Sequence, residues 1–219
     1  MGRGDNMKGF KCVFLTVLIL ALMVWVSAYE VSARQALSKK IAPDVPAEIS
    51  ETLAANADVY LTGGGGKEVL FIADPFCPNS RKTYSLLLSR LEYIRTVKVV
   101  LVCSLPHTGS DVLAALVMRM HSAGKGQLAL ETTFKLEVPQ TSDRDAARQM
   151  ALELFKRAFP DELGAVDFKA IMPELDVVKR NTNLAKEIDY TGTPHLIVGG
   201  RVLHGYSDRA IDILLKNDF

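Results

Sequence analysis

Cysteine is scarce in this chain of 219 residues, which contains three: Cys12, Cys77 and Cys103. Cys12 lies at the edge of an apolar N-terminal segment, so only two cysteines belong to the rest of the sequence. A small fold held together by several disulfides is therefore excluded. No spacing of cysteines and histidines fits a zinc site. We expect no metal and no organic cofactor.

An excess of charge of either sign is also absent. The sequence has 26 lysines and arginines against 25 aspartates and glutamates, which gives a formal net charge of +1 at pH 7. Proteins that bind nucleic acid usually carry a basic surface that neutralises phosphates. The sequence therefore predicts no nucleic-acid partner.

The first 28 residues have the composition of a targeting segment. Basic residues precede an apolar run at 13–26, and small residues at 26–28 and 31–33 fit two cleavage sites. Because this run is shorter than the roughly 20 residues of a transmembrane helix, a cleaved signal peptide is favoured over an uncleaved inner-membrane anchor. In both cases the positive-inside rule places the rest of the chain outside the cytoplasm. In a bacterium with two membranes this compartment is the periplasm, where cysteine redox chemistry is expected.

The remaining sequence predicts a linker with a short helix over 29–56 and one α/β domain over 57–219. Two strands joined by four glycines predict a β-hairpin, and neither a Gly-Lys-Ser/Thr sequence nor a helix follows to make the glycines a phosphate loop. The order of elements predicts a mixed central sheet with helices on both faces and a helical insertion. The expected elements are strands at 58–62, 67–73 and 97–103, a helix at 78–95, a helical block at about 110–190 with Ser142 as a helix N-cap, and a final hairpin and helix at 194–216.

One cysteine stands where a protein would present a reactive thiol. The apolar run from Val69 to Ala73 ends in a turn bounded by proline, and Cys77 follows at the expected start of a helix. Free N–H groups and the partial positive charge of a helix N-terminus favour thiolate over thiol, and the thiolate is the nucleophile. A redox motif with two cysteines would have the second at position 80, where this chain has Ser80.

Two segments of the sequence resemble a known family. Asp74-Pro75-Phe76-Cys77-Pro78 resembles the active-site segment of the thioredoxin-fold disulfide oxidoreductases of the bacterial envelope, the Dsb class. Thr191-Gly192-Thr193-Pro194 with the apolar run after it resembles the second hallmark of that class. The resemblance covers about 57–219 and implies a thioredoxin-like fold. It also implies that Cys77 is the nucleophile, that Pro194 is the family's cis-proline, and that Thr193, Pro194 and Pro78 bind substrate.

The serine at position 80 departs from the family pattern and limits the chemistry. Without a second cysteine in the motif, Cys77 can form a mixed disulfide with a substrate, and another thiol must then release it. The substrate's own second cysteine, an external small thiol or Cys103 can supply that thiol. Cys103 ends the strand parallel to the one before Cys77, so it faces the same edge of the sheet. The alternative is that Cys103 is a buried, inert side chain.

Several neighbours of Cys77 have two interpretations. Ser80 either donates a hydrogen bond to the thiolate or is an inert replacement. Arg81 either stabilises the thiolate or is solvated, and Asp74 opposes thiolate formation if it lies close. His195 either contacts the thiol or is turned away from the Pro194 face by strand alternation, which we favour.

These observations predict an exported enzyme of thiol–disulfide exchange that acts on exported proteins or peptides through a mixed disulfide at Cys77. Turnover can involve a membrane redox partner. The segment before residue 57 is too small for a dimerisation domain, so we expect a monomer. The alternative is a non-catalytic module that holds a peptide of an envelope secretion or conjugation assembly in the groove beside Pro194. Cys77 would then be a structural residue.

Overall fold

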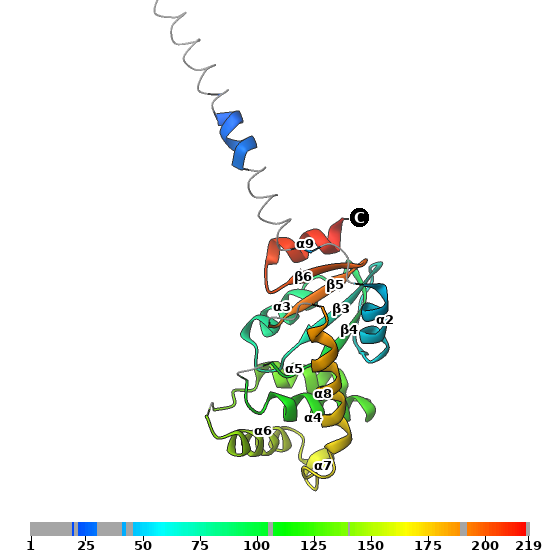
Figure 1. Cartoon of the computed structure of the whole chain (residues 1–219), viewed down its shortest axis with the longest axis vertical. Helices are drawn as coiled ribbons and strands as arrows, with labels where there is room; N and C mark the ends of the chain where they lie inside the picture. Colours follow the sequence, from blue (N-terminus) through cyan, green and yellow to red (C-terminus); the bar gives the residue numbers. More distant parts are fainter. Residues whose placement is uncertain are drawn as a thin grey trace, which may run out of the picture. The chain divides into compact units, whose positions relative to one another are not determined.

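The computed structural model describes residue 19 and residues 22–29, 41–42, 46–104, 107–139, 141–188 and 192–217. The chain divides into two compact units, Met1–Lys40 and Ile41–Phe219 (Figure 1). In the first unit residues 22–29 are helical. Most of the expected targeting segment lies outside the described residues. Within the described ranges, no helix combines the length and the apolar character needed to cross a membrane.

The second unit is built on one mixed sheet. In the described residues six strands lie in the order β1-β6-β5-β3-β4-β2. β3 and β4 are parallel, and every other neighbouring pair is antiparallel. Residues 69–73 of the central strand β3 are all buried, as expected where helices cover both faces. The strands are β1 (Ile41–Ala42), β2 (Asp58–Thr62), β3 (Lys67–Ala73), β4 (Ile94–Leu101), β5 (His195–Val198) and β6 (Arg201–His204).

The expected hairpin of the first two long strands is wrong. β2 pairs antiparallel with β4, so β4 lies between β2 and β3. The four-glycine segment crosses the start of β4, where Gly63 N donates to Arg95 O and Gly65 N donates to Ile94 O. A Cβ atom at Gly65 would lie 2.1 Å from the carbonyl carbon of Tyr93. Gly63 and Gly65 are therefore needed for a close crossing of two backbones rather than for a tight hairpin turn.

The helix after Cys77 is shorter than expected. α3 (Pro78–Leu88) ends before a turn, and β4 begins at Ile94 instead of residue 97. Ile94 and Val97 are fully buried, and Ile94 pairs with Lys67 of β3. Because sheet pairing and burial are gained at Ile94, the segment 94–96 is a strand rather than the end of the helix.

The helical insertion separates β4 from β5, and Figure 1 shows α4 to α7 grouped below the sheet. The N-cap of α6 is Asp143 rather than Ser142, because the Asp143 carboxylate accepts from the N–H groups of Asp145 and Ala146, both at 3.0 Å. The insertion contains α4 (Ser110–Ser122), α5 (Gly126–Lys135), α6 (Arg144–Ala158), α7 (Pro160–Leu163) and α8 (Met172–Lys186), and α9 (Asp208–Lys216) closes the chain.

Residues expected in the linker belong to the second unit. β1 pairs antiparallel with β6, with Ile41 opposite Leu203. α2 (Ala47–Ala55) buries Leu53 completely in a cluster with Leu70 and other aliphatic side chains of the sheet. The compact unit therefore begins at Ile41, ahead of the expected boundary at residue 57, because this cluster needs the apolar face of α2.

Candidate active site

Cys77 is held between a buried strand and a helix. β3 ends at Ala73, and the turn that follows is closed by a hydrogen bond from Cys77 N to Asp74 O at 3.1 Å. Cys77 is the N-cap residue of α3, and Pro78 occupies the first turn, where its missing N–H costs nothing and its fixed φ suits a helix. The side chain of Cys77 is only 6% exposed.

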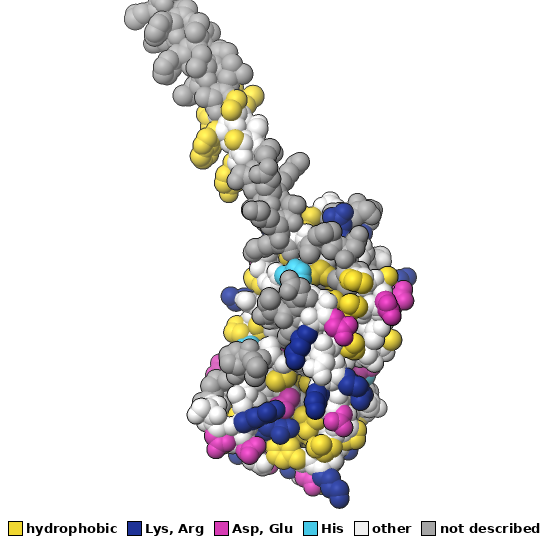
Figure 2. Space-filling model, viewed as in Figure 1, with side chains coloured by type: hydrophobic (Ala, Val, Ile, Leu, Met, Phe, Trp, Pro, Cys, Tyr) yellow, Lys and Arg dark blue, Asp and Glu magenta, His cyan; other side chains and the backbone are white. Residues whose placement is uncertain are grey.

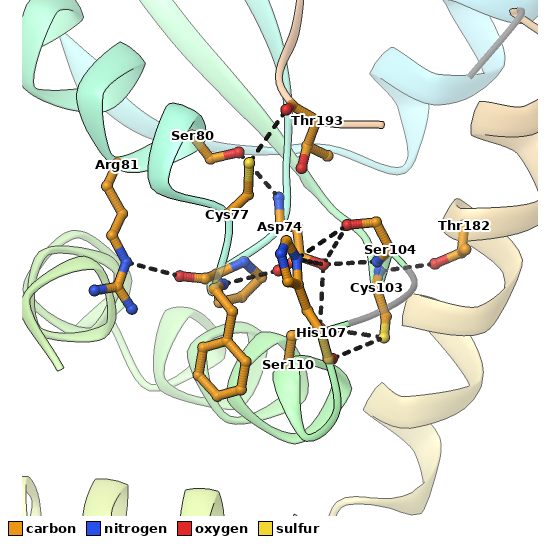
Figure 3. A network of polar contacts seen from close by, with 12 residues as sticks. Asp74, Cys77, Ser80, Arg81, Cys103, Ser104, His107, Ser110, Thr182 and Thr193 are labelled. Atoms are coloured by element: carbon orange, nitrogen blue, oxygen red, sulfur yellow. Dashed lines mark hydrogen bonds and ion pairs between the residues drawn. The ribbon is translucent and has the colours of Figure 1, made fainter. Parts of the chain in front are cut away.

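The loop that carries Pro194 faces the sulfur. The Thr193–Pro194 peptide bond is cis, and the Cys77 thiol donates to the carbonyl oxygen of Thr193, with Sγ 3.1 Å from that oxygen (Figure 3). β5, which follows this loop, is the antiparallel neighbour of β3, so His195 lies opposite Ile72. The sheet thus brings the expected site residues together from distant parts of the sequence.

Asp74 links the turn before Cys77 to two other segments. Its carboxylate is fully buried and accepts four hydrogen bonds, from Phe76 N, Ser104 N, Ser104 Oγ and Ser110 Oγ, at 2.6–3.2 Å. Nδ1 of His107 lies 3.3 Å from its Oδ2 atom. These partners offset the cost of burying a carboxylate. Asp74 therefore holds together the active-site turn, the loop after β4 and the start of α4 (Figure 3).

His107 is paired with the carboxylate of Asp74. The hydrogen bond to Asp74 raises the pKa of His107 above its ordinary value and outweighs the opposite effect of burial. The sequence pattern alone assigns no role to His107, Ser104 or Ser110. These three residues follow one another at intervals of three, just after β4, the strand parallel to β3. This spacing is the one sequence signal that could have pointed to them.

Cys103 lies beyond the end of β4 with its sulfur in a different environment from that of Cys77. Ser110 Oγ lies 3.1 Å from Cys103 Sγ and 3.2 Å from Asp74 Oδ2, so its one proton is shared between these two acceptors. Cys103 N donates to Thr182 Oγ1 at 3.0 Å. Burial raises the pKa of the Cys103 thiol, against a smaller opposing effect of the Ser110 hydrogen bond. Both Cys77 and Cys103 are free thiols. Burial therefore favours the thiol form of Cys103.

Ser80 and Arg81 have defined backbone partners near the site. Ser80 is fully buried, and its hydroxyl oxygen accepts from Asp74 N at 3.4 Å. The Arg81 guanidinium donates to Pro75 O at 3.3 Å and to Leu136 O at 2.9 Å, and burial lowers the pKa of Arg81. Arg81 therefore joins α3 to the loop after α5 instead of extending into solvent.

His195 supports the loop that carries Pro194. Its Nε2 atom lies 2.7 Å from Gly192 O, and its Nδ1 atom lies 2.8 Å from Nδ1 of His204. A carbonyl oxygen only accepts, so Nε2 of His195 carries a proton, and in the neutral pair His204 donates to His195. Both ring nitrogens of the buried His195 are engaged in this way. The pair therefore links the loop that carries Pro194 to β6 and stabilises its position.

The described residues contain no group of three or more His, Cys, Asp or Glu side chains that could hold a metal ion.

A strand that leads to a cysteine at a helix N-terminus, faced by a cis-proline loop, is the arrangement of a thioredoxin-like fold, and solved structures confirm this fold for the chain. A periplasmic thioredoxin-like protein from Salmonella enterica serovar Typhimurium matches with a TM-score of 0.57 and 16% identity, over 78% of this chain and 96% of that protein. ScsC from Proteus mirabilis in a transitional conformation matches with a TM-score of 0.59 and 12% identity, over 98% and 95%.

A thioredoxin-like oxidoreductase from Silicibacter pomeroyi DSS-3 matches with a TM-score of 0.54 and 17% identity, over 77% of this chain and 98% of that protein. No protein-family model and no curated protein matches the sequence. The resemblance inferred from the sequence is therefore confirmed for the fold, and the role of each residue rests on the geometry of this chain.

Proposed function

We propose that this protein is an exported enzyme of thiol–disulfide exchange with one nucleophilic thiol. The Cys77 thiolate attacks one sulfur of a disulfide in an exported protein, the substrate disulfide breaks, and its other sulfur leaves as a thiolate. A second thiolate then attacks the substrate sulfur of the mixed disulfide and releases Cys77. Burial raises the pKa of the Cys103 thiol, which favours the substrate's own cysteine or an external small thiol for this second step.

The observation that carries the proposal is the contact between the Cys77 sulfur and the carbonyl oxygen of Thr193 at 3.1 Å. The thiol donates a proton in this contact, whereas a thiolate has none to donate. Ionisation of Cys77 therefore frees the Thr193 carbonyl to accept from the backbone of an extended substrate segment. The Thr193 hydroxyl is buried and has no hydrogen-bond partner among the described residues, so a bound segment can satisfy it as well.

The cellular setting follows from the N-terminal segment and from the fold. We propose that residues 1–28 direct export and are cleaved, and that the mature protein acts as a monomer in the periplasm on cysteine-containing exported proteins. A matched structure described as a periplasmic thioredoxin-like protein supports this compartment, and one described as a thiol–disulfide exchange protein, α-DsbA2 from Wolbachia pipientis, supports the reaction.

A non-catalytic binding module is the second candidate. It is favoured by the serine at position 80, whose hydroxyl is used by the backbone N–H of Asp74, and by the near-complete burial of the Cys77 sulfur. In that protein the loop at Thr193 would bind a peptide of an envelope assembly without covalent chemistry. A bulky substitution of Thr193 would then abolish binding, and substitution of Cys77 would change little.

The rate of Cys77 alkylation as a function of pH distinguishes the two candidates. The protein without residues 1–28 and with Cys103→Ala is treated with iodoacetamide and compared with a free cysteine peptide, and Cys77→Ser/Cys103→Ala provides the blank. The proposal expects Cys77 to react faster than the peptide at pH 6–7 and to form a trapped mixed disulfide with a disulfide-bonded peptide. If Cys77 is alkylated more slowly than the free peptide at every pH, the exchange activity is excluded and the binding module is supported.

A further inference from the structure

A cavity of about 740 Å³ borders the active site. Cys103 and Ser104 line one part of it, and Gly192 lines it immediately before Thr193. Ser104 donates to the buried carboxylate of Asp74, which also holds the turn before Cys77. A substrate segment that passes Cys77 and Thr193 therefore reaches this cavity with little further length. Its volume is in the range of a pocket that accepts several side chains.

The floor of the cavity is apolar and belongs mainly to α8. Leu175 and Val178 line it with their side chains largely buried, and Met172 lines it with 49% of its surface exposed. Aliphatic side chains of a bound segment can therefore bury surface here, which is the dominant favourable contribution to most such contacts.

The rim of the cavity is basic. Four cationic side chains line it, namely Arg144 and Arg148 from α6 and Lys179 and Lys186 from α8, against the acidic side chains of Asp111 and Asp176. Figure 2 shows Lys and Arg side chains gathered over the lower half of this face, with hydrophobic side chains between them.

The acidic side chains do not balance these cations. Asp111 is already shared between Arg148 at 3.2 Å and Arg144 at 4.0 Å. Arg148 is also fixed over the ring of Phe168 at 5.4 Å, so its guanidinium is preorganised. Lys179 has no ion-pair partner within the described part of the chain. The cavity thus offers an apolar floor beneath a rim that favours negative charge.

We propose that this cavity binds a segment of the substrate polypeptide that carries acidic and aliphatic residues and flanks the cysteine attacked by Cys77. The proposal rests on the proposed function, because it gives that reaction a preferred class of substrate. The apolar floor takes the aliphatic side chains, and the cations from α6 and α8 pair with carboxylates on either side. An isolated small anion would leave the floor uncovered, so a peptide segment fits the lining better.

The test uses the full chain with Cys77→Ser, so that binding is measured without covalent chemistry. The probe is a rhodamine-labelled decapeptide of alternating Glu, Asp and Leu, compared with a peptide in which Gln and Asn replace the acids. Fluorescence anisotropy measures both affinities. Reversal of two rim charges in Arg144→Glu/Lys179→Glu is expected to weaken binding of the acidic peptide by about tenfold, as expected for the loss of two partly exposed ion pairs.

A charge-matched control is available in the same helical insertion. Arg157→Glu/Lys169→Glu makes the same change in net charge at exposed side chains outside the cavity, and it should leave the affinity unchanged. Arg144 is 74% exposed and Lys179 is exposed, so their replacement should preserve the fold, which circular dichroism checks. Equal affinity for the acidic and amide peptides, or equal loss in the control variant, overturns the proposal. Self-association that only the rim variant abolishes also overturns it and assigns the cavity to a second copy of the chain.

Failure of this inference is distinguishable from failure of the proposed function. A neutral disulfide-bonded peptide is offered to the wild-type protein, and the mixed disulfide at Cys77 is trapped. If the mixed disulfide forms but the Cys77→Ser protein binds the acidic and amide peptides equally, the acidic preference of the cavity is excluded and the exchange reaction is supported. If acidic peptides bind but no mixed disulfide forms with any peptide, the role in exchange falls and the site is that of a binding module.

Discussion

The sulfur of Cys77 lies 3.1 Å from the carbonyl oxygen of Thr193, and the thiol donates a hydrogen bond to that oxygen. This contact ties the protonation of one residue to the availability of the other. A thiol occupies the carbonyl, and a thiolate vacates it and is repelled by it. In the proposed function, ionisation of Cys77 and release of the Thr193 carbonyl are therefore one event.

Replacement of Cys77 by serine should abolish formation of the mixed disulfide and leave the fold intact. Serine is a favoured N-cap residue, so α3 keeps a suitable start. Trapping with a disulfide-bonded peptide, read by mass spectrometry, measures the chemistry, and thermal unfolding measures the fold. Cys103→Ala is the matched control and should still form the adduct. An adduct in the Cys77→Ser protein at the wild-type level would exclude Cys77 as the nucleophile.

Replacement of Asp74 by asparagine should lower the free energy of unfolding by about 1–3 kcal/mol, because buried donors lose their acceptor. The Oδ2 atom of Asp74 accepts from both Ser104 and Ser110, and an amide NH₂ group placed there would face these donors. Urea denaturation measures the change. Asp161→Asn, at an exposed position of α7, is the control and should stay within about 0.5 kcal/mol of wild type. A neutral result for Asp74→Asn would mean that the network does not hold the three segments together.

The ion pair between His107 and Asp74 predicts a dependence of stability on pH. The pKa of His107 is raised in the folded protein, so its contribution to the free energy of unfolding is complete below the unfolded value of about 6.5. That contribution is lost as the pH rises through the higher folded-state pKa. His107→Gln should therefore be less stable than wild type at pH 6, and the gap should narrow towards pH 8. A gap that widens with rising pH would contradict the sign of this linkage.

Local patterns predict the centre of the site well. The apolar run of β3, the proline-bounded turn and Cys77 before α3 follow from short-range sequence signals, and so does the Gly-Gly hairpin of β5 and β6. The contacts of Asp74 with Ser104 and Ser110 could not be predicted in this way. These residues meet only when the loop after β4 folds beside the active-site turn, and no periodicity reports such a meeting.

Two predictions, the N-cap of α6 and the partner strand of β2, were wrong because the sequence offers two nearly equivalent choices for each. Ser142 and Asp143 are both good N-cap residues, and the carboxylate of Asp143 is the one that reaches two N–H groups. The order of the strands in the sequence predicts that β2 pairs with β3, which follows it directly. In the sheet, β2 pairs with the more distant β4. Strand order in a mixed sheet depends on crossovers, which short windows of sequence do not contain.

Cys103 should be a slow nucleophile in the folded protein. Burial raises its pKa, so a smaller fraction is thiolate at neutral pH than in the unfolded chain. In the Cys77→Ser protein without residues 1–28, which also lacks Cys12, alkylation of Cys103 at pH 7.5 should be slower without urea than in urea. Mass spectrometry follows the single adduct. Reaction at the unfolded rate would return Cys103 to consideration as the thiol that resolves the mixed disulfide.

The glycine crossing between β2 and β3 supplies a test of the topology that is independent of the site. A Cβ atom at Gly65 would lie 2.1 Å from the carbonyl carbon of Tyr93, and at Gly64 it would meet nothing within 4 Å. Gly65→Ala should therefore lower the free energy of unfolding by about 1–3 kcal/mol through a forced backbone shift. Gly64→Ala is the matched control and should be nearly neutral in urea denaturation. Equal effects of the two substitutions would mean that the segment does not pass closely over the start of β4. The close backbone crossing would then not explain why β2 pairs with β4 instead of β3.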